Sequence, residues 1–277
     1  MNSVVLLSLV MFFSVLPKNS EETFWRLTTP RPTKLPSDPN APIYRKLQII
    51  PSPKKTAQLM LENFFDFHPA SKVTKRSLVL EDIVFIMDGS GSVPKCEFYE
   101  GLKAFAQAIE MCEKPKDGNT YNCRHAAVTF STQARVDFQF LPSAEARQKI
   151  RLIPYPDGST NTQAGLAKAE NLFLTGSRRF SKLKVLLLTD GRSNVDRHLT
   201  IPNAEKLKKN LGVQISVVAV GDLDTLAIQE MAGIASSAPE KHVFRIRKIS
   251  DLVYIFEMAL EKLNSGKLQA KPYQSPC

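Results

Sequence analysis

Residues 81–93 read EDIVFIMDGSGSV, an apolar run that ends abruptly in a glycine-rich polar loop. A run of β-branched and aromatic residues is typical of a strand that is buried on both faces of a sheet. In open α/β sheets, ligands bind outside the carboxyl ends of the strands. The sequence therefore predicts a ligand site in the loop of residues 88–92.

Oxygen-bearing side chains alternate in this loop at Asp88, Ser90 and Ser92. The intervening glycines allow a turn tight enough to aim all three side chains at one point. One carboxylate and two hydroxyls are hard donors that suit Mg²⁺, Mn²⁺ or Ca²⁺ better than zinc or copper. The alternative is a plain strand-to-helix turn, with Ser92 as the N-cap and Pro94 as the first helical residue.

From residue 77 onward, strand patterns and helix patterns alternate along the chain. We expect strands at residues 82–87, 125–130, 134–140, 184–189, 214–220 and 242–246. We expect helices at residues 95–113, 144–152, 163–175, 201–211, 225–235 and 251–263. Ser143 and Ser250 are candidate N-caps. Only three residues separate the second and third strands, so these two should form a hairpin. The pattern predicts an α/β fold, a doubly wound and mostly parallel six-stranded sheet with helices on both faces.

Two further polar loops follow expected structural breaks at residues 158–162 (GSTNT) and 189–191 (TDG). They contribute Thr160 and Asp190 as candidate oxygen ligands. The carboxyl ends of central parallel strands meet at one crevice, so we expect these loops to converge with residues 88–92. Three separate segments would then form one metal site.

The motifs DGSGS, GSTNT and LLTDG, in this order and spacing, resemble the metal-ion-dependent adhesion site of von Willebrand factor type A domains. The resemblance covers roughly residues 81–263. It includes MAGIASSAPEKHVFRI at residues 231–246, which is similar to the type A domains of matrilins and type VI collagen.

By this resemblance, Ser90 and Ser92 bind the metal directly, and Thr160 joins them in the ligand-competent state. Asp88 and Asp190 are implied to act largely through water. Mg²⁺ held mainly by neutral hydroxyls and water keeps much of its charge and attracts an anionic ligand, here a Glu or Asp of a partner protein. In the related integrin domains, the resemblance implies, the terminal helix slides when the counterpart of Thr160 moves onto the metal. The alternative is that residues 251–263 are simply a core helix packed on the sheet.

The ends of the chain lie outside this resemblance. Residues 4–16 form an unbroken apolar run that is too short to span a membrane, and we assign residues 1–20 to a signal peptide with an uncertain cleavage point. No other stretch approaches the length of a transmembrane segment. Residues 21–76 form an extension, a possible propeptide because Lys75 and Arg76 precede the domain. The domain itself is placed at residues 81–264 and a tail at residues 265–277.

The extension is rich in proline and basic residues. Residues 17–76 hold 11 Lys and Arg against five Asp and Glu, so most of the net charge of +10 lies there. We expect residues 17–53 to be extended or disordered. Residues 54–68 form either a short docking helix or a loosely ordered linker with one hydrophobic cluster. No nucleic-acid-binding module accompanies the charge, so we expect no nucleic-acid partner.

Four cysteines are consistent with an oxidising compartment. Cys112 and Cys123 flank a short polar loop between a helix and a strand, and we expect them to form a disulfide. Cys96 and Cys277 can pair with each other or with a thiol on another chain.

These features favour a secreted extracellular-matrix or adhesion protein that binds partners through a divalent metal. The expected partners are matrix or cell-surface proteins that present an acidic residue. The alternative is a structural matrix protein whose basic extension does the binding. No phosphate-binding loop or nucleophile elbow is present, and the four histidines are scattered, so we expect no enzymatic activity.

Overall fold

The computed structural model describes residues 35–38, 41–68, 77–116 and 118–277. The proposed signal peptide and the dibasic pair at residues 75–76 lie outside these ranges. None of the described helices is both long and apolar enough to cross a bilayer.

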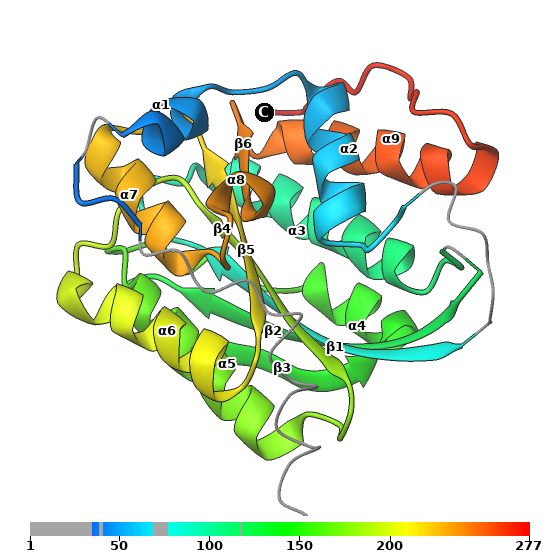
Figure 1. Ribbon diagram of the computed structural model, residues 1–277, viewed down its shortest axis with the longest axis horizontal. Helices are drawn as coiled ribbons and strands as arrows, with labels where there is room; N and C mark the ends of the chain where they lie inside the picture. Colours follow the sequence, from blue (N-terminus) through cyan, green and yellow to red (C-terminus); the bar gives the residue numbers. More distant parts are fainter. Residues whose placement is uncertain (1–34, 39–40, 69–76, 117) are drawn as a thin grey trace, which may run out of the picture. The chain divides into compact units, whose positions relative to one another are not determined.

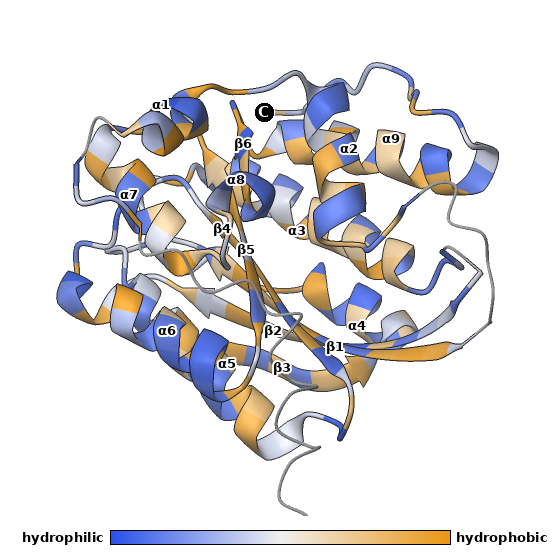
Figure 2. Ribbon diagram, viewed as in Figure 1, coloured by the Kyte–Doolittle hydropathy of each residue, from blue (hydrophilic) through white to orange (hydrophobic). Residues whose placement is uncertain are grey.

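A six-stranded sheet of order β3-β2-β1-β4-β5-β6 forms the centre of the fold (Figure 1). Its strands are β1 (Leu78–Asp88), β2 (Thr120–Phe130), β3 (Ala134–Pro142), β4 (Lys182–Thr189), β5 (Gln214–Val220) and β6 (Val243–Ile246). All neighbouring strands pair in parallel except β2 and β3, which form the expected antiparallel hairpin. The central strands are apolar, as their orange colour in Figure 2 shows, because helices cover both faces.

Two hydrophobic cores flank the sheet. One face packs against α2 (Pro53–Asn63), α3 (Lys95–Cys112), α4 (Ser143–Ile150) and α9 (Ser250–Ser265). The other packs against α1 (Pro42–Gln48), α5 (Thr162–Gly176), α6 (Thr200–Asn210) and α7 (Thr225–Ile234). The turn η1 (Arg197–Leu199) precedes α6, and α8 (Pro239–His242) precedes β6. The doubly wound α/β fold predicted from the sequence is confirmed.

The helix starts differ from the predicted caps. Pro142 and Ile249, not Ser143 and Ser250, occupy the N-cap positions of α4 and α9. Ser250 instead donates to Glu97 from its main-chain nitrogen (2.7 Å) and its hydroxyl (3.0 Å), so a side chain on α3 caps α9. Helix α3 begins at residue 95, after Pro94, which excludes Ser92 as its N-cap.

The extension contributes two helices, which the sequence analysis did not anticipate in full. The expectation of an extended or disordered segment is wrong for α1, whose Tyr44 and Leu47 are 3% and 4% exposed. Their spacing of three residues places both on one helix face, and Pro42 supplies a favourable first residue. The buried Arg245 of β6 donates to the main-chain oxygen of Leu47 (2.8 Å) and so ties α1 to the sheet.

Helix α2 docks on α9, so the alternative of a loosely ordered linker is also wrong for residues 53–65. Phe64 and Phe65 follow the helix and are each 1% exposed. The ring of Phe65 meets that of Phe256 on α9 edge to face, with centroids 6.0 Å apart. Ser52 caps α2 by accepting from the main-chain nitrogen of Lys55 (3.3 Å).

The segment after α2 also completes a buried ionic cluster. Lys184 on β4 is 1% exposed, and its amine donates to the Glu81 carboxylate (2.8 Å) and to the main-chain oxygen of Phe64 (2.7 Å). Asp66 approaches the same amine at 3.2 Å. A buried ammonium group requires such partners, so residues 64–66 form part of the domain's interior.

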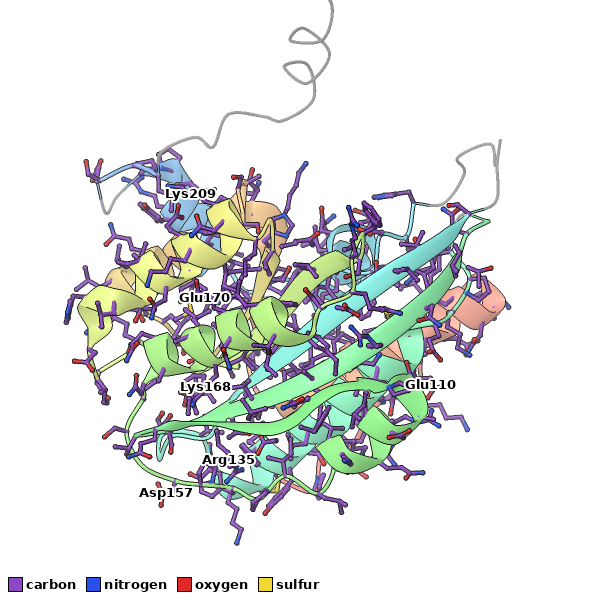
Figure 3. The ribbon with its side chains drawn as sticks, turned by 90° about the horizontal axis from the view of Figure 1, so that it is seen from below. Glu110, Arg135, Asp157, Lys168, Glu170 and Lys209 are labelled. Atoms are coloured by element: carbon purple, nitrogen blue, oxygen red, sulfur yellow. A yellow bond between two sulfur atoms is a disulfide. The ribbon has the colours of Figure 1, made fainter. Side chains whose placement is uncertain are left out.

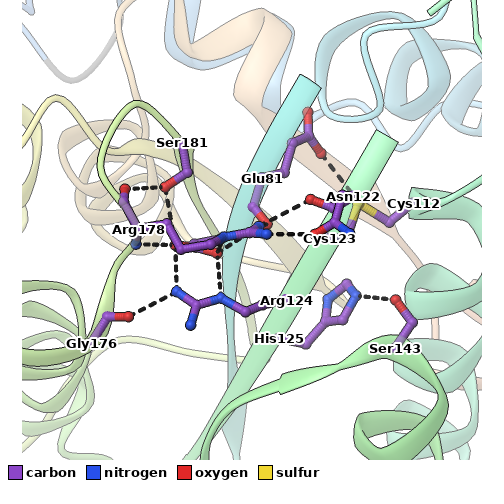
Figure 4. Close-up of polar contacts among 11 residues, drawn as sticks. Glu81, Cys112, Asn122, Cys123, Arg124, His125, Ser143, Gly176, Arg178 and Ser181 are labelled. Atoms are coloured by element: carbon purple, nitrogen blue, oxygen red, sulfur yellow. Dashed lines mark hydrogen bonds and ion pairs between the residues drawn. A yellow bond between two sulfur atoms is a disulfide. The ribbon is translucent and has the colours of Figure 1, made fainter. Parts of the chain in front are cut away.

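A second polar network fixes the amino-terminal end of the sheet (Figure 4). Asp82 on β1 is fully buried and accepts from the guanidinium groups of Arg124 (2.9 Å) and Arg178 (2.9 Å) and from the hydroxyl of Ser181 (3.0 Å). Burial alone would raise the pKa of Asp82, but these hydrogen bonds and the Arg178 charge lower it below the ordinary value. The network lies at the opposite strand end from residues 88–92.

Both cysteine pairs are disulfides. The expected Cys112–Cys123 bond is confirmed, and Cys96 pairs with Cys277, which decides between the two alternatives left open by the sequence. The tail therefore returns to the first turn of α3. There the Tyr273 hydroxyl donates to Glu100 and accepts from the Lys103 amine (2.7 Å).

Candidate metal centre

The loop of residues 88–92 leaves the carboxyl end of β1 in the centre of the sheet. Asp88 is fully buried at the strand end, where its carboxylate accepts from the main-chain nitrogen of Ser90 (2.9 Å) and from the Thr189 hydroxyl (2.6 Å). Thr189 is the last residue of β4. The neighbouring parallel strands thus fix the orientation of Asp88, as expected from convergence at the carboxyl ends.

Glycine is required in this loop because another segment lies directly against it. A Cβ atom on Gly89 would stand 2.6 Å from the ring of Pro156, and one on Gly91 would stand 2.8 Å from the Asp157 carboxylate. The main-chain nitrogen of Gly91 donates to the oxygen of Gly158 (2.7 Å). The missing side chains let the two loops touch, near the position marked by Asp157 in Figure 3.

The hydroxyls of Ser90 and Ser92 and the Asp190 carboxylate form a continuous row of oxygens. Ser90 Oγ lies 3.1 Å from Ser92 Oγ, and Ser92 Oγ donates to Asp190 Oδ1 at 2.9 Å. Adjacent ligands of an octahedral Mg²⁺ ion with bonds of about 2.1 Å are separated by about 3 Å. The spacing and the hard-oxygen chemistry of these side chains therefore suit a small divalent cation.

Thr160 is held in place through its main chain. Its nitrogen donates to the Asn194 side chain (2.9 Å), and its oxygen accepts from the main chain of Asn194 (2.9 Å) and the hydroxyl of Ser193 (3.1 Å). Ser193 in turn donates from its nitrogen to Glu230 on α7 (2.8 Å). Within the described ranges, the hydrogen bonds that connect Ser90, Ser92 and Asp190 do not extend to the Thr160 hydroxyl.

The sequence analysis did not identify Glu230 and Tyr155, which hold the loops of the site in place. Glu230 is 3% exposed and lies within the apolar helix sequence TLAIQEMAGI, where an isolated acidic residue was an available signal. Tyr155 gave no signal, but its hydroxyl donates to the main-chain oxygens of Ser90 (3.1 Å) and Val93 (2.9 Å). Tyr155 thus links the two ends of the loop through its hydroxyl.

The electrostatics of the site favour a bound cation. Burial raises the pKa of Asp88 to about 6, and the neighbouring charge of Asp190 contributes in the same direction. Burial also raises the pKa of Asp190. Two carboxylates that share a desolvated site resist ionisation together, and a divalent cation between them would relieve that repulsion. The residues present thus fit a divalent metal.

The two arginines that follow Asp190 in the sequence are engaged in ion pairs. Arg197 pairs with Glu230 (2.8 Å), and Arg192 pairs with Asp224 (3.6 Å). Their charges are therefore offset locally.

A family model described as the von Willebrand factor type A domain matches residues 82–258. Integrin alpha-D of Homo sapiens is 30% identical over 193 residues, which cover 66% of this chain and 16% of that protein. Von Willebrand factor A domain-containing protein 2 of Homo sapiens is 30% identical over 174 residues, covering 61% of this chain and 22% of that protein. The chain thus spans less than a quarter of the length of these relatives.

A solved structure shares the fold. Proximal thread matrix protein 1 from the mussel byssus, with a zinc-occupied MIDAS motif, superposes with a TM-score of 0.53 and 24% sequence identity. The match covers 66% of this chain and 45% of that structure.

Proposed function

Because the chain belongs to the von Willebrand factor type A domain family, we propose that it is an adhesion module that binds protein ligands through a divalent metal. Asp88, Ser90, Ser92, Thr160 and Asp190 would hold the ion, with Mg²⁺ preferred and Mn²⁺ or Ca²⁺ as substitutes. The ion would bind the carboxylate of a Glu or Asp on a matrix or cell-surface protein. The proposed role is binding rather than catalysis, and the proposed location is the extracellular matrix after secretion.

The observation that carries this proposal is the row of oxygens from Ser90 through Ser92 to Asp190, backed by the buried carboxylate of Asp88. The ligands are all oxygens, which favours Mg²⁺, Mn²⁺ or Ca²⁺ over zinc. The mussel byssus protein has zinc in its metal-ion-dependent adhesion site (the MIDAS motif), so the affinity for zinc should be measured beside the affinity for Mg²⁺ and Mn²⁺. Integrin and collagen relatives support an extracellular adhesion role.

Calorimetric titration with Mg²⁺, Mn²⁺ and Zn²⁺ tests the metal site. We expect Asp88→Ala and Asp190→Ala to abolish binding of Mg²⁺ while leaving the domain folded, because neither side chain belongs to a hydrophobic core. Glu170→Ala on α5 (Figure 3), a half-buried residue outside the three loops of the site, is the matched control and should bind Mg²⁺ like the wild type. Unchanged Mg²⁺ affinity in both aspartate variants would refute the proposed site.

The alternative, in which the basic extension binds the matrix, is tested by deleting only part of the extension. Residues 42–66 belong to the folded unit, so their removal would expose both cores. Deleting residues 17–34 leaves the described helices intact. Matrix binding that disappears with this deletion and resists EDTA would support the alternative.

A further inference from the structure

A hollow of about 460 Å³ opens directly beside Asp190. Its walls come from the first turn of α3, the loops that follow β5 and β6, and the last residue of the chain. The lining includes Pro94, Val220, Ile249 and the Cys96–Cys277 disulfide. Because Asp190 belongs both to this lining and to the oxygen row, the hollow and the proposed metal site form one continuous surface.

The walls of the hollow are fixed by covalent and polar contacts. The disulfide attaches the tail to α3, and the contacts of Tyr273 with Glu100 and Lys103 hold the preceding tail residues. Glu97 accepts two hydrogen bonds from Ser250 and thereby ties α3 to the loop before α9. Such a preformed site loses little entropy when a ligand side chain enters.

Two cations stand at the mouth of this hollow. Arg247 and Lys248 line it, and both side chains are exposed. In the part of the chain that the structure describes, neither forms an ion pair, in contrast to Arg192 and Arg197.

In the described part of the chain, the acidic residues of the hollow form no ion pair with these two cations. Glu97 is committed to Ser250, and Asp190 accepts from Ser92 and faces the proposed ion. Of the three acidic side chains in the lining, Asp222 is exposed, and Glu97 and Asp190 are half-buried. A bound divalent metal would offset the negative charges of Asp88 and Asp190, and the exposed Arg247 and Lys248 would then remain available to pair with an acidic side chain.

We propose that this hollow binds a second acidic side chain of the same protein ligand, next to the carboxylate taken by the metal. The inference rests on the proposed function and specifies its partner: a segment with two nearby Glu or Asp residues. The volume lies within the range of ligand-binding pockets, which is about 300 to 1,000 Å³, and leaves room for an acidic side chain and its adjoining backbone. The Cys277 end of the tail becomes part of the binding surface.

Fluorescent hexaglutamate, which presents pairs of carboxylates at many spacings, is the probe. We expect Mg²⁺-dependent binding, and we expect R247Q/K248Q to weaken it about three- to tenfold, the range expected for exposed charge pairs. Mg²⁺ affinity measured without the peptide should not change. The control K168Q/R151Q removes the same net charge from exposed positions outside the hollow and should have a much smaller effect.

Asp222→Asn gives a prediction of the opposite sign. Removing this carboxylate relieves repulsion, so hexaglutamate should bind more tightly, by about twofold. If the hollow instead receives a cationic side chain of the ligand, a labelled (Glu-Arg)₃ peptide should bind more tightly than hexaglutamate. Asp222→Asn should then weaken binding of that peptide.

The outcomes separate the two proposals. Absence of Mg²⁺-dependent binding of either peptide would count against the metal-mediated function itself. Mg²⁺-dependent hexaglutamate binding that responds equally to R247Q/K248Q and to the control would retain the metal site and overturn the second acidic subsite. Tighter binding of (Glu-Arg)₃ would also overturn it.

Discussion

Phe65→Ala tests whether the helices before β1 are integral to the domain. Phe65 is 1% exposed and contacts Phe64, with ring centroids 5.0 Å apart, as well as Phe256 on α9. Truncation of a buried phenylalanine to alanine costs about 3 to 5 kcal/mol, because it removes apolar contact and leaves a cavity. Domains are stable by only about 5 to 15 kcal/mol, so this loss should be prominent.

Urea unfolding followed by circular dichroism measures the effect. The expected result is a single cooperative transition whose midpoint falls while its slope is unchanged. Phe180→Ala is the matched control, because Phe180 is 87% exposed and its truncation should change stability by no more than about 0.5 kcal/mol. A loss below about 1 kcal/mol for Phe65→Ala, or a separate early transition, would show that the extension docks independently of the core.

The partner ring supplies a second check. A double-mutant cycle of Phe65→Ala and Phe256→Ala should give a coupling energy of about 0.5 to 1.5 kcal/mol, the range expected for a direct aromatic pair. Additive losses would mean that α2 and α9 are stabilised separately, despite the 6.0 Å between their ring centroids.

Three further predictions concern buried polar groups and the short disulfide. Arg178→Ala leaves a buried carboxylate short of a partner and should cost about 3 to 5 kcal/mol in urea unfolding, whereas the adjacent exposed Arg179→Ala should be nearly neutral. Burial lowers the pKa of His125 to about 3. As the pH falls from 6.5 toward 3, only the unfolded state takes up a proton at this imidazole. The folded protein therefore loses stability over this range, by about 3 kcal/mol at pH 4. An NMR titration should find this imidazole neutral at pH 4.5, and a charged ring would contradict the assignment. Replacing both cysteines of Cys112–Cys123 by serine should cost about 3 kcal/mol, and an unchanged melting temperature would contradict a stabilising role.

The sheet and its loops could be predicted from the sequence because their signals are local. Buried parallel strands read as apolar runs, and the glycine-rich break after Asp88 marks the strand end. The convergence of residues 88–92 with Asp190 followed from a general rule of α/β sheets. In the structure, Ser92 and Asp190 are in direct contact, 98 positions apart in the sequence.

The features that the sequence did not reveal depend on distant partners. The composition of the extension predicts a segment without a core, yet Tyr44 and Leu47 bury themselves on a surface that the domain provides. The sequence shows only a lysine within a strand. It does not show that the amine of Lys184 is bound by Phe64 and Asp66. The sequence left the pairing of Cys277 with Cys96 as one of two alternatives, and the tertiary structure decides between them. In each case, tertiary contacts override the local propensity.

These distant contacts bear on whether α9 can slide, as the resemblance to integrin domains implies. Glu97 holds the first turn of α9, Phe65 packs against its middle, and the Cys96–Cys277 disulfide ties the segment beyond its end to α3. Phe65 and Cys277 both lie outside the residues that match the family model. A two-state switch requires two packings of similar energy, and a slide of α9 would disturb all three contacts at once. We therefore expect Phe256→Ala to lower stability without raising Mg²⁺-dependent affinity for hexaglutamate, because the cap and the disulfide still fix the helix. An increase in affinity would show that the packing of α2 alone restrains the switch.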